Sequence, residues 1–476
     1  MSNILLFDKI LTHVNVNHRI IANTYLHVHN SHPELLKKYK LTRGEKYFLS
    51  IKFKLIFITK VFQSLFDKRH FYSQNKSVKS RVLFISHLTN NQQIYKDFDP
   101  YFGSLPDQLL KRNIDSSIVL LNHTGIRNKK ALSGWKNSKI SRFVLSASLS
   151  FWPEIKLYHS QKKSKKELKF ILKDLHVENF SKKNILQRQL SYGTINSLRI
   201  AKQVASIIQK TGAKYIVTTY EGHAWERLIY YYARKVDPSI QCFGYQHAAV
   251  FKHQHAIKRL LSDQYNPDII LTSGQVSKSI FEKSQMKDVR TMCLGSPKFT
   301  TPSFTVMKLK SCLVIPEGFI SECLALFKFS LSYAEQNKDQ KFIWRLHPML
   351  NFEKLQRYSD IFKKIPNNIY LSKRSLADDI QKCDCVLYRG STAVIDAINK
   401  GLKPIYYQQS LDELSIDPIY QQLDVNIVSN QVELGRSLNK CGDYDATSRL
   451  ISFAQNFYTP LNVECFAELC IDNDKG

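Results

Sequence analysis

Short apolar runs recur along the first part of this chain, and each gives way to small, polar or charged residues. They include RVLFISHLTN (81–90), SSIVLLNHTG (116–125), IQCFGYQHAA (240–249) and PDIILTSG (267–274). Segments with helical apolar spacing lie between them, such as IAKQVASIIQKTG, which ends at Gly212, a favourable helix C-cap. Buried strands that alternate with helices predict a parallel sheet covered on both faces.

The same alternation starts again after a connector that carries Pro and Thr at 298–310, with CLVIPEG, KFIWRLHP, DCVLYRGST and KPIYY as its apolar runs. We therefore predict an α/β protein with two Rossmann-like, doubly wound domains that face each other across a cleft. The expected divisions are a basic N-terminal segment (1–78), a first domain (79–305) and a second domain (306–476). A lysine-rich stretch at 154–190 predicts a solvent-facing helical insertion in the first domain.

The charge of the chain is strongly basic, with 69 Lys and Arg against 40 Asp and Glu and a formal net charge of +29. Such an excess suits nucleic acid, an anionic membrane surface or phosphorylated substrates, and a solvated basic surface without a partner is the alternative. No RRM, KH, zinc-finger or helix-turn-helix signature is present, so we expect no nucleic-acid partner. A basic nucleic-acid-binding protein is the alternative to the enzymatic interpretations given below.

Residues 46–69, KYFLSIKFKLIFITKVFQSLFDKR, are rich in Phe, Ile and Leu and carry lysines at 52, 54 and 60. This mixture suits a segment that lies in an anionic membrane interface. The alternation over 51–57 predicts a buried strand equally well. No window is long and apolar enough to span a bilayer, and we find no secretory signal.

The nine cysteines all lie beyond position 240, are odd in number and lack zinc-finger spacing. Reduced thiols are the simplest interpretation, and they indicate a cytoplasmic protein that contacts the membrane peripherally if at all.

Two strand ends in the second half carry groups that suit a phosphate. RLHP supplies Arg345 as a planar fork, His347 as a donor to a phosphate oxygen, and Pro348 as a first-turn helix residue. A capping His and a surface Arg are the alternative. One unit later, RGST offers Arg389, Gly390, Ser391 and Thr392 at the predicted start of a helix, whose free amides attract anions. A plain Ser/Thr N-cap is the alternative there.

Three further strand ends carry candidate residues. PEG places Glu317 where it could bind ribose hydroxyls or a base edge, and Gly318 where backbone could approach a ligand; a tight turn is the alternative. YEGHAWE makes Glu221 a candidate general base or nucleophile, and a helix-start Glu is the alternative. GYQHA places His247 in the same predicted cleft. The HQH sequence at 253–255 lacks a carboxylate cluster, so we expect no metal.

RLHP and YRGSTAVIDA, set in the second of two Rossmann-like halves, resemble the GT-B fold glycosyltransferases of bacterial surface polysaccharide synthesis. Within that group they are similar to the sialyltransferases and Kdo transferases, whose HP motif and downstream Ser-Ser or Ser-Thr pair hold the CMP phosphate. Arg345, His347 and Pro348 match the first motif, and Ser391 and Thr392 match the second. The resemblance covers about 310–410 and, loosely, 215–250. The acidic D/E-D/E-G motif of the sialyltransferases is reduced here to Glu221-Gly222, which leaves the catalytic residue and the stereochemistry open.

The resemblance implies a metal-independent glycosyltransferase at the inner face of the bacterial cytoplasmic membrane. It would transfer a sugar from a CMP-linked donor to a surface-polysaccharide or lipid-linked glycan acceptor, with no cofactor besides the donor. The teichoic-acid glycerophosphotransferases have a similar RxHP and a later Ser-Ser followed by an acid, near which Asp396 falls. Polyol-phosphate transfer from CDP-glycerol or CDP-ribitol is therefore the alternative activity.

Overall fold

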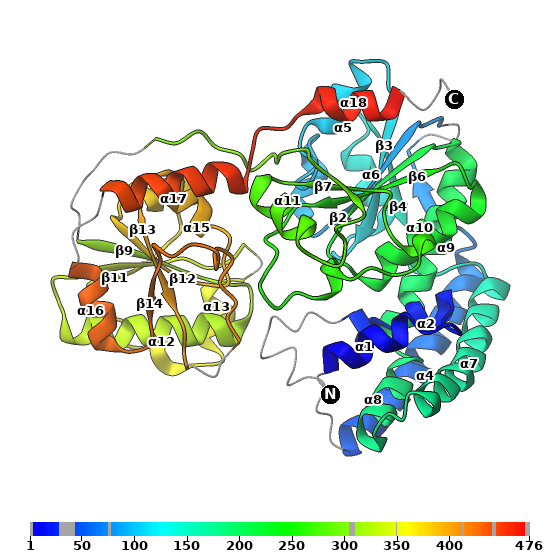
Figure 1. The fold of residues 1–476 in the computed structure, drawn as a ribbon, viewed down its shortest axis with the longest axis horizontal. Helices are drawn as coiled ribbons and strands as arrows, with labels where there is room; N and C mark the ends of the chain where they lie inside the picture. The colour runs from blue at the N-terminus through cyan, green and yellow to red at the C-terminus, as the bar shows by residue number, and fades with distance from the viewer. Residues whose placement is uncertain are drawn as a thin grey trace.

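The computed structural model describes residues 3–27, 43–74, 78–303, 310–348, 350–410, 414–439 and 444–471. Two lobes stand side by side, each built on one twisted sheet (Figure 1). The predicted α/β fold with two Rossmann-like domains is confirmed.

The first sheet has eight strands in the order β1-β4-β3-β2-β5-β6-β7-β8, and every neighbouring pair is parallel except β1 with β4. Its inner strands are buried along nearly their whole length, as expected of a sheet with two covered faces. The strands are β1 (Phe71–Ser73), β2 (Val82–Leu88), β3 (Ser116–Asn122), β4 (Ser141–Leu145), β5 (Tyr215–Thr219), β6 (Gln241–Gln246), β7 (Ile269–Thr272) and β8 (Arg290–Cys293).

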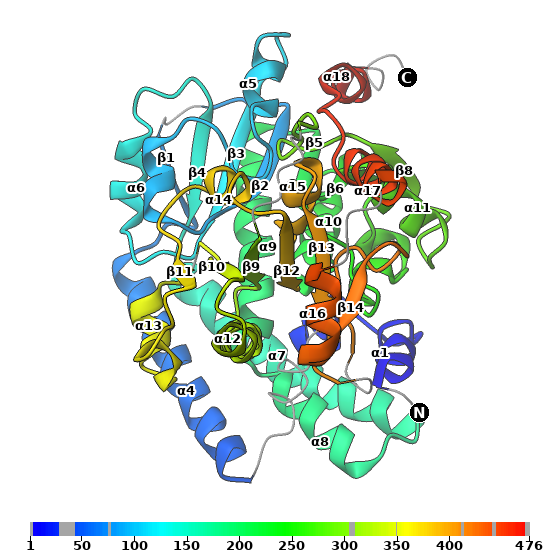
Figure 2. The ribbon, with the colours of Figure 1, turned by 90° about the vertical axis from the view of Figure 1, so that its left-hand side faces the viewer.

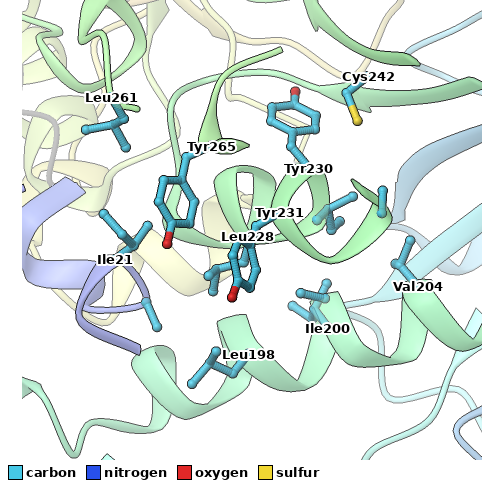
Figure 3. Packing of buried hydrophobic residues seen from close by; sticks show 14 of the residues in the cluster. Ile21, Leu198, Ile200, Val204, Leu228, Tyr230, Tyr231, Cys242, Leu261 and Tyr265 are labelled. Carbon is cyan, nitrogen blue, oxygen red and sulfur yellow. The ribbon is translucent and has the colours of Figure 1, made fainter. Parts of the chain in front are cut away.

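Separate hydrophobic clusters cover the two faces of this sheet. One face packs against α9 (Tyr192–Thr211), α10 (Ala224–Val236) and α11 (Gln275–Glu282). Figure 3 shows part of this cluster, with Leu198 of α9 below Leu228 and Tyr231 of α10. The other face packs against α5 (Leu105–Leu110) and α6 (Asn128–Gly134). Helix α9 ends as predicted, because Gly212 caps it in the left-handed region with φ of 69°.

The second sheet has six strands, all parallel, in the order β11-β10-β9-β12-β13-β14. Helices again cover both faces. The strands are β9 (Ser311–Pro316), β10 (Lys341–Trp344), β11 (Ile369–Leu371), β12 (Cys385–Arg389), β13 (Lys403–Tyr407) and β14 (Asn426–Val428). The helices are α12 (Ile320–Gln336), α13 (Phe352–Gln356), α14 (Leu376–Ile380), α15 (Val394–Asn399) and α16 (Gln431–Asn439).

A layer of helices from distant parts of the sequence packs beside the first sheet: α1 (Asn3–Leu11), α2 (His18–Ile21), α4 (Arg43–Phe66), α7 (Phe151–Asp174) and α8 (Asn179–Arg188). The strand alternative for 51–57 is wrong, because these residues lie within α4. The solvent-facing expectation for 154–190 holds for only one side of α7. On its other side, Leu157, Leu168 and Ile171 are buried in the core.

The C-terminal helices pass from the second domain to the first. Helix α17 (Tyr444–Phe457) packs on the second sheet, whereas α18 (Val463–Ile471) buries Val463 and Phe466 against the first (Figure 1). The expected second domain at 306–476 therefore includes a segment that packs with the first domain. Among the described residues, no helix combines the length and apolar character needed to cross a membrane.

Candidate functional site

The two domains meet at the loop that follows β6. Ala249 is buried in the hydrophobic cluster of the second domain, and Phe251 packs against the same cluster. Ser273, after β7, accepts a hydrogen bond at its backbone oxygen from the amide of Thr459, at 3.1 Å. Because parallel strands end at the same edge of a sheet, the loops after β5 and β6 lie at this junction together.

Glu221 lies in the tight turn between β5 and α10. Gly222 has φ of 81°, and a Cβ there would lie 2.3 Å from the carbonyl carbon of Ala256, so only glycine fits. The buried carboxylate of Glu226 accepts the backbone N–H groups of Glu221, Gly222 and His223 at 2.8–3.1 Å. These bonds fix the turn that presents the side chains of Glu221 and His223.

Glu221 and two histidines form the centre of the first-domain cluster. Nε2 of His223 lies 2.9 Å from Oε2 of Glu221, and Nε2 of His247 lies 3.8 Å from Oε1. Burial alone would lower the pKa of His223, but the bond to Glu221 and the charges of Glu226 and Glu221 raise it to about 9. Burial lowers the pKa of His247 to about 4, so this ring is neutral at pH 7. The structure therefore brings together the Glu221 and His247 that sequence reasoning placed in one cleft.

Two more histidines extend this cluster, and the sequence analysis did not select them. His87 lies on β2. Its Nδ1 is 2.9 Å from Nε2 of His123, and its Nε2 is 3.0 Å from the hydroxyl oxygen of Thr219. Trp225 packs edge-on against His87. Burial and the neighbouring His123 lower the pKa of His87 to about 3. The signal for both was in the sequence, since each occurs where an apolar run turns polar.

The second-domain cluster forms at the ends of β9, β10 and β12. Gly318 lies close to the ring of His347, since a Cβ at Gly318 would be 3.2 Å from Nδ1 of that ring. Gly390 adopts φ of 71°, and a Cβ there would lie 2.5 Å from Oε2 of Glu317. Both glycines therefore allow close packing that any side chain would disturb. Four of the predicted residues, Glu317, Gly318, His347 and Gly390, are brought together.

The two predicted arginines are held by acids of the second domain. Arg389 is fully buried; its Nε donates to Glu322, and its Nη1 donates to the carbonyl of Tyr407 at 3.1 Å. The expectation that Arg389 binds phosphate is therefore wrong, because its guanidinium points into the core between β12 and α12. Arg345 pairs through Nη1 with Asp379 at 2.8 Å and with the carbonyl of Arg374 at 2.7 Å, so this part of its fork holds the loop after β11.

The remaining predicted phosphate-site residues, Ser391, Thr392 and Pro348, lie in turns that follow strands of the second sheet. Ser391 and Thr392 are half-buried in the turn before α15, and no hydrogen bond between described residues uses their hydroxyl groups. Helix α15 has six residues and Ala393 as its N-cap, so neither hydroxyl caps it. Pro348 is exposed in the turn after β10. The expectation that it begins a helix is wrong, because α13 starts at Phe352.

Lys298 links the two clusters electrostatically. It follows β8, its side chain is exposed, and its ammonium group lies 5.8 Å from the ring centre of Tyr458. Burial is the main cause that lowers the pKa of His247 and of His347, and the positive charge of Lys298 adds to both shifts. Burial raises the pKa of Asp396 to about 6, and Lys298 opposes that shift. One cation therefore lies within electrostatic reach of both domains.

A cavity of about 770 Å³ opens elsewhere at the junction, between α1, α11 and the second domain. Its lining includes Lys258, Lys283, Tyr420 and Phe453 but neither of the two clusters. Among the described residues, no group of three or more His, Cys, Asp or Glu side chains is arranged to hold a metal ion.

The arrangement of two parallel-sheet domains with a C-terminal helix that returns to the first is that of the GT-B fold. No protein-family model matches the chain, and no curated protein matches its sequence. Among solved structures, the glycotransferase of kitacinnamycin matches with a TM-score of 0.47 and 10% identity, over 82% of this chain and 98% of that one. The UDP-GlcNAc 2-epimerase from Methanocaldococcus jannaschii has a TM-score of 0.44 and 12% identity, over 78% and 99%. MurG from Acinetobacter baumannii matches with a TM-score of 0.45 and 9% identity, over 83% of this chain and 99% of that one. Likeness at this level says nothing about the chemistry of this chain.

Proposed function

We propose that this protein is a glycosyltransferase that moves a sugar from a nucleotide-activated donor to a glycan or lipid-linked glycan acceptor. The second domain would bind the donor, and the first would bind the acceptor. We propose a cytidine nucleotide, in line with the resemblance of RLHP and RGST to enzymes that use CMP-linked donors. The reaction would take place at the inner face of the cytoplasmic membrane, where a lipid-linked acceptor is accessible.

The observation that carries the proposal is that the positive charge of Lys298 acts on His247 in the first domain and on His347 in the second, so one cation is near both clusters. Ligands of open α/β sheets bind beyond the carboxyl ends of the strands. A phosphate placed there would be attracted by the positive charge of Lys298 and would accept a hydrogen bond from His347. The hydroxyl groups of Ser391 and Thr392 lie in the turn after β12 and could complete the contact.

The mechanism that fits the geometry uses Glu221 as the general base. Its Oε2 is held by His223, and Oε1 faces His247 at a distance longer than a hydrogen bond. An acceptor hydroxyl beside Oε1 and His247 would donate its proton to Glu221 as its oxygen attacks the anomeric carbon. The bond from that carbon to the donor phosphate breaks, and the phosphate leaves with the electron pair. Lys298 and His347 would stabilise the negative charge that develops on it.

The donor assignment is tested by thermal denaturation with CMP, CDP, UDP, GDP and ADP, because a ligand of the native state raises the melting temperature. We expect stabilisation by CMP, lost in His347→Ala and retained in His159→Ala, whose ring is exposed on α7. Stabilisation by UDP alone would remove the cytidine assignment and leave the fold-based proposal standing. Stabilisation by none of them would count against a nucleotide donor.

The reaction is tested by product analysis with the donor that stabilises best. We expect a new glycosidic bond, and turnover at least about a hundredfold lower in Glu221→Gln with donor affinity unchanged. A phosphodiester product from CDP-glycerol or CDP-ribitol would instead establish polyol-phosphate transfer.

A further inference from the structure

Helix α4 carries a continuous apolar stripe on its exposed side. Of the nineteen exposed large hydrophobic residues in the described chain, six lie on this one helix, so they form a surface rather than isolated positions. They are Ile51, Leu55, Ile58, Phe62, Leu65 and Phe66, with exposed fractions from 42% to 78%. At about 3.6 residues per turn these positions fall within an arc of about 100° and extend over about 22 Å.

The opposite side of α4 is the one that packs against the protein, so the stripe is not the face by which α4 joins the core. Phe57 stacks on Tyr158 of α7 with ring centres 4.0 Å apart, and Ser64 is buried. Helix α4 therefore docks on the layer through one face and leaves a second apolar face outside. Figure 2 shows α4 at the edge of the helical layer, away from the first sheet.

Basic residues surround the stripe. Lys52 and Lys54 are exposed on opposite sides of the stripe. Around the helix axis, Lys52 lies about 100° from Ile51 in one direction, and Lys54 lies about 60° from it in the other. The neighbouring α7 exposes six lysines, and no ion pair between described residues uses any of them: Lys156, Lys162, Lys163, Lys166, Lys169 and Lys173.

Two of the three acids of α7 are paired with arginines, and the third, Asp174, is exposed and contacts a histidine. Glu154 pairs with the buried Arg199, Glu167 pairs with Arg19, and Asp174 pairs with His13. Helix α4 therefore exposes an apolar stripe with a lysine on each flank, and the neighbouring α7 adds six exposed lysines to the same helical layer. Exposed apolar side chains with cations at their edge match the acyl boundary and the anionic headgroups of a lipid surface.

We propose that α4 is a membrane-docking helix: the stripe from Ile51 to Phe66 enters the interfacial region of an anionic lipid surface, and the lysines of α4 and α7 bind the headgroups. This inference deepens the proposed function, on which its biological sense rests, because it places the enzyme beside a lipid-linked acceptor. The physical claim itself concerns only the α4–α7 surface.

The test is sedimentation of the full chain with vesicles of phosphatidylcholine, alone or mixed with phosphatidylglycerol. We expect binding to the mixed vesicles that weakens as salt is added. Ile58→Asp combined with Phe62→Asp should weaken it at least about tenfold, because burial of the apolar side chains is lost. Leu423→Asp combined with Tyr358→Asp removes two apolar residues that are at least as exposed and lie elsewhere, and it should leave vesicle binding unchanged.

Three results would overturn the proposal. The wild-type chain fails to bind anionic vesicles; the stripe variant, with an unchanged melting temperature, binds as well as wild type; or sedimentation equilibrium shows a dimer that the stripe variant dissolves, so that a second copy covers the stripe. Turnover with a water-soluble acceptor, measured without vesicles, separates this failure from a failure of the proposed function. The stripe variant should keep that turnover.

Discussion

The ring of His223 lies 2.9 Å from the carboxylate of Glu221, two residues earlier in the same turn, and the pair sits where β5 opens into α10. The bond keeps the histidine protonated well above its usual range. His247, a few ångströms away, is kept neutral by burial. Of the two histidines beside this carboxylate, His223 is therefore protonated and His247 neutral at pH 7.

The Glu221–His223 pair makes stability depend on pH on the alkaline side. The folded pKa of His223 is raised to about 9 from 6.5, so the pair's contribution is complete below pH 6.5 and is lost as the pH rises through 9. The melting temperature of His223→Gln should lie below that of wild type at pH 7, and the two should converge by pH 10. A constant difference across this range would show that the ring stays neutral.

Lys298→Gln should change both clusters while the fold is kept. Loss of the nearby positive charge should raise the pKa of His347 in an NMR titration. Donor affinity should fall about tenfold, as expected for one charge-assisted phosphate contact. Lys287→Gln, exposed in the loop before β8, is the matched control. An unchanged His347 pKa in Lys298→Gln would contradict the electrostatic link.

Gly318→Ala should impair donor binding more than stability. The new methyl group would lie 3.2–3.3 Å from the ring of His347, so the imidazole must shift by a few tenths of an ångström. We expect a several-fold weaker donor affinity by calorimetry with the melting temperature nearly unchanged. Gly125→Ala, which meets nothing within 4 Å, should leave donor affinity as it is. Equal effects of the two changes would rule out a role for the Gly318–His347 contact.

Arg389→Met should destabilise the second domain rather than weaken donor binding. The change leaves the buried Glu322 without its partner, which costs about 3–5 kcal/mol. Urea unfolding should show this loss, and the double variant Arg389→Met/Glu322→Gln should regain most of it. A folded single variant with wild-type stability and abolished donor affinity would restore the phosphate-binding interpretation of Arg389.

Phe466→Ala tests the return of the chain to the first domain. Phe466 is fully buried, and its ring centre lies 6.0 Å from that of Phe84 and 5.9 Å from that of Phe243. The cavity should lower the free energy of unfolding by about 3–5 kcal/mol. Ile471→Ala, half-exposed at the end of α18, is the control and should cost much less. Equal losses would mean that α18 does not dock as described.

The fold class could be predicted from the sequence because most strands of both sheets are local apolar runs. The runs at 81–90, 116–125 and 240–249 became β2, β3 and β6, since a buried parallel strand needs apolar residues on both faces. The short edge strands β1 and β14 escaped notice, because an edge strand of three residues buries too little to leave a pattern. Residues 51–57 were ambiguous for another reason: a helix with two apolar faces also places apolar residues at alternate positions.

The sequence by itself determined which strand ends carry candidate site residues, because a polar break after a buried strand is visible without coordinates. It therefore named Glu221, His247 and His347. Only the tertiary structure decided where each side chain points. Arg389 turns into the core toward Glu322, whereas the positive charge of Lys298, in a connector, affects the pKa of histidines in both clusters. Direction and proximity depend on how separate elements pack, and no local pattern of residues encodes a distance between segments far apart in the chain.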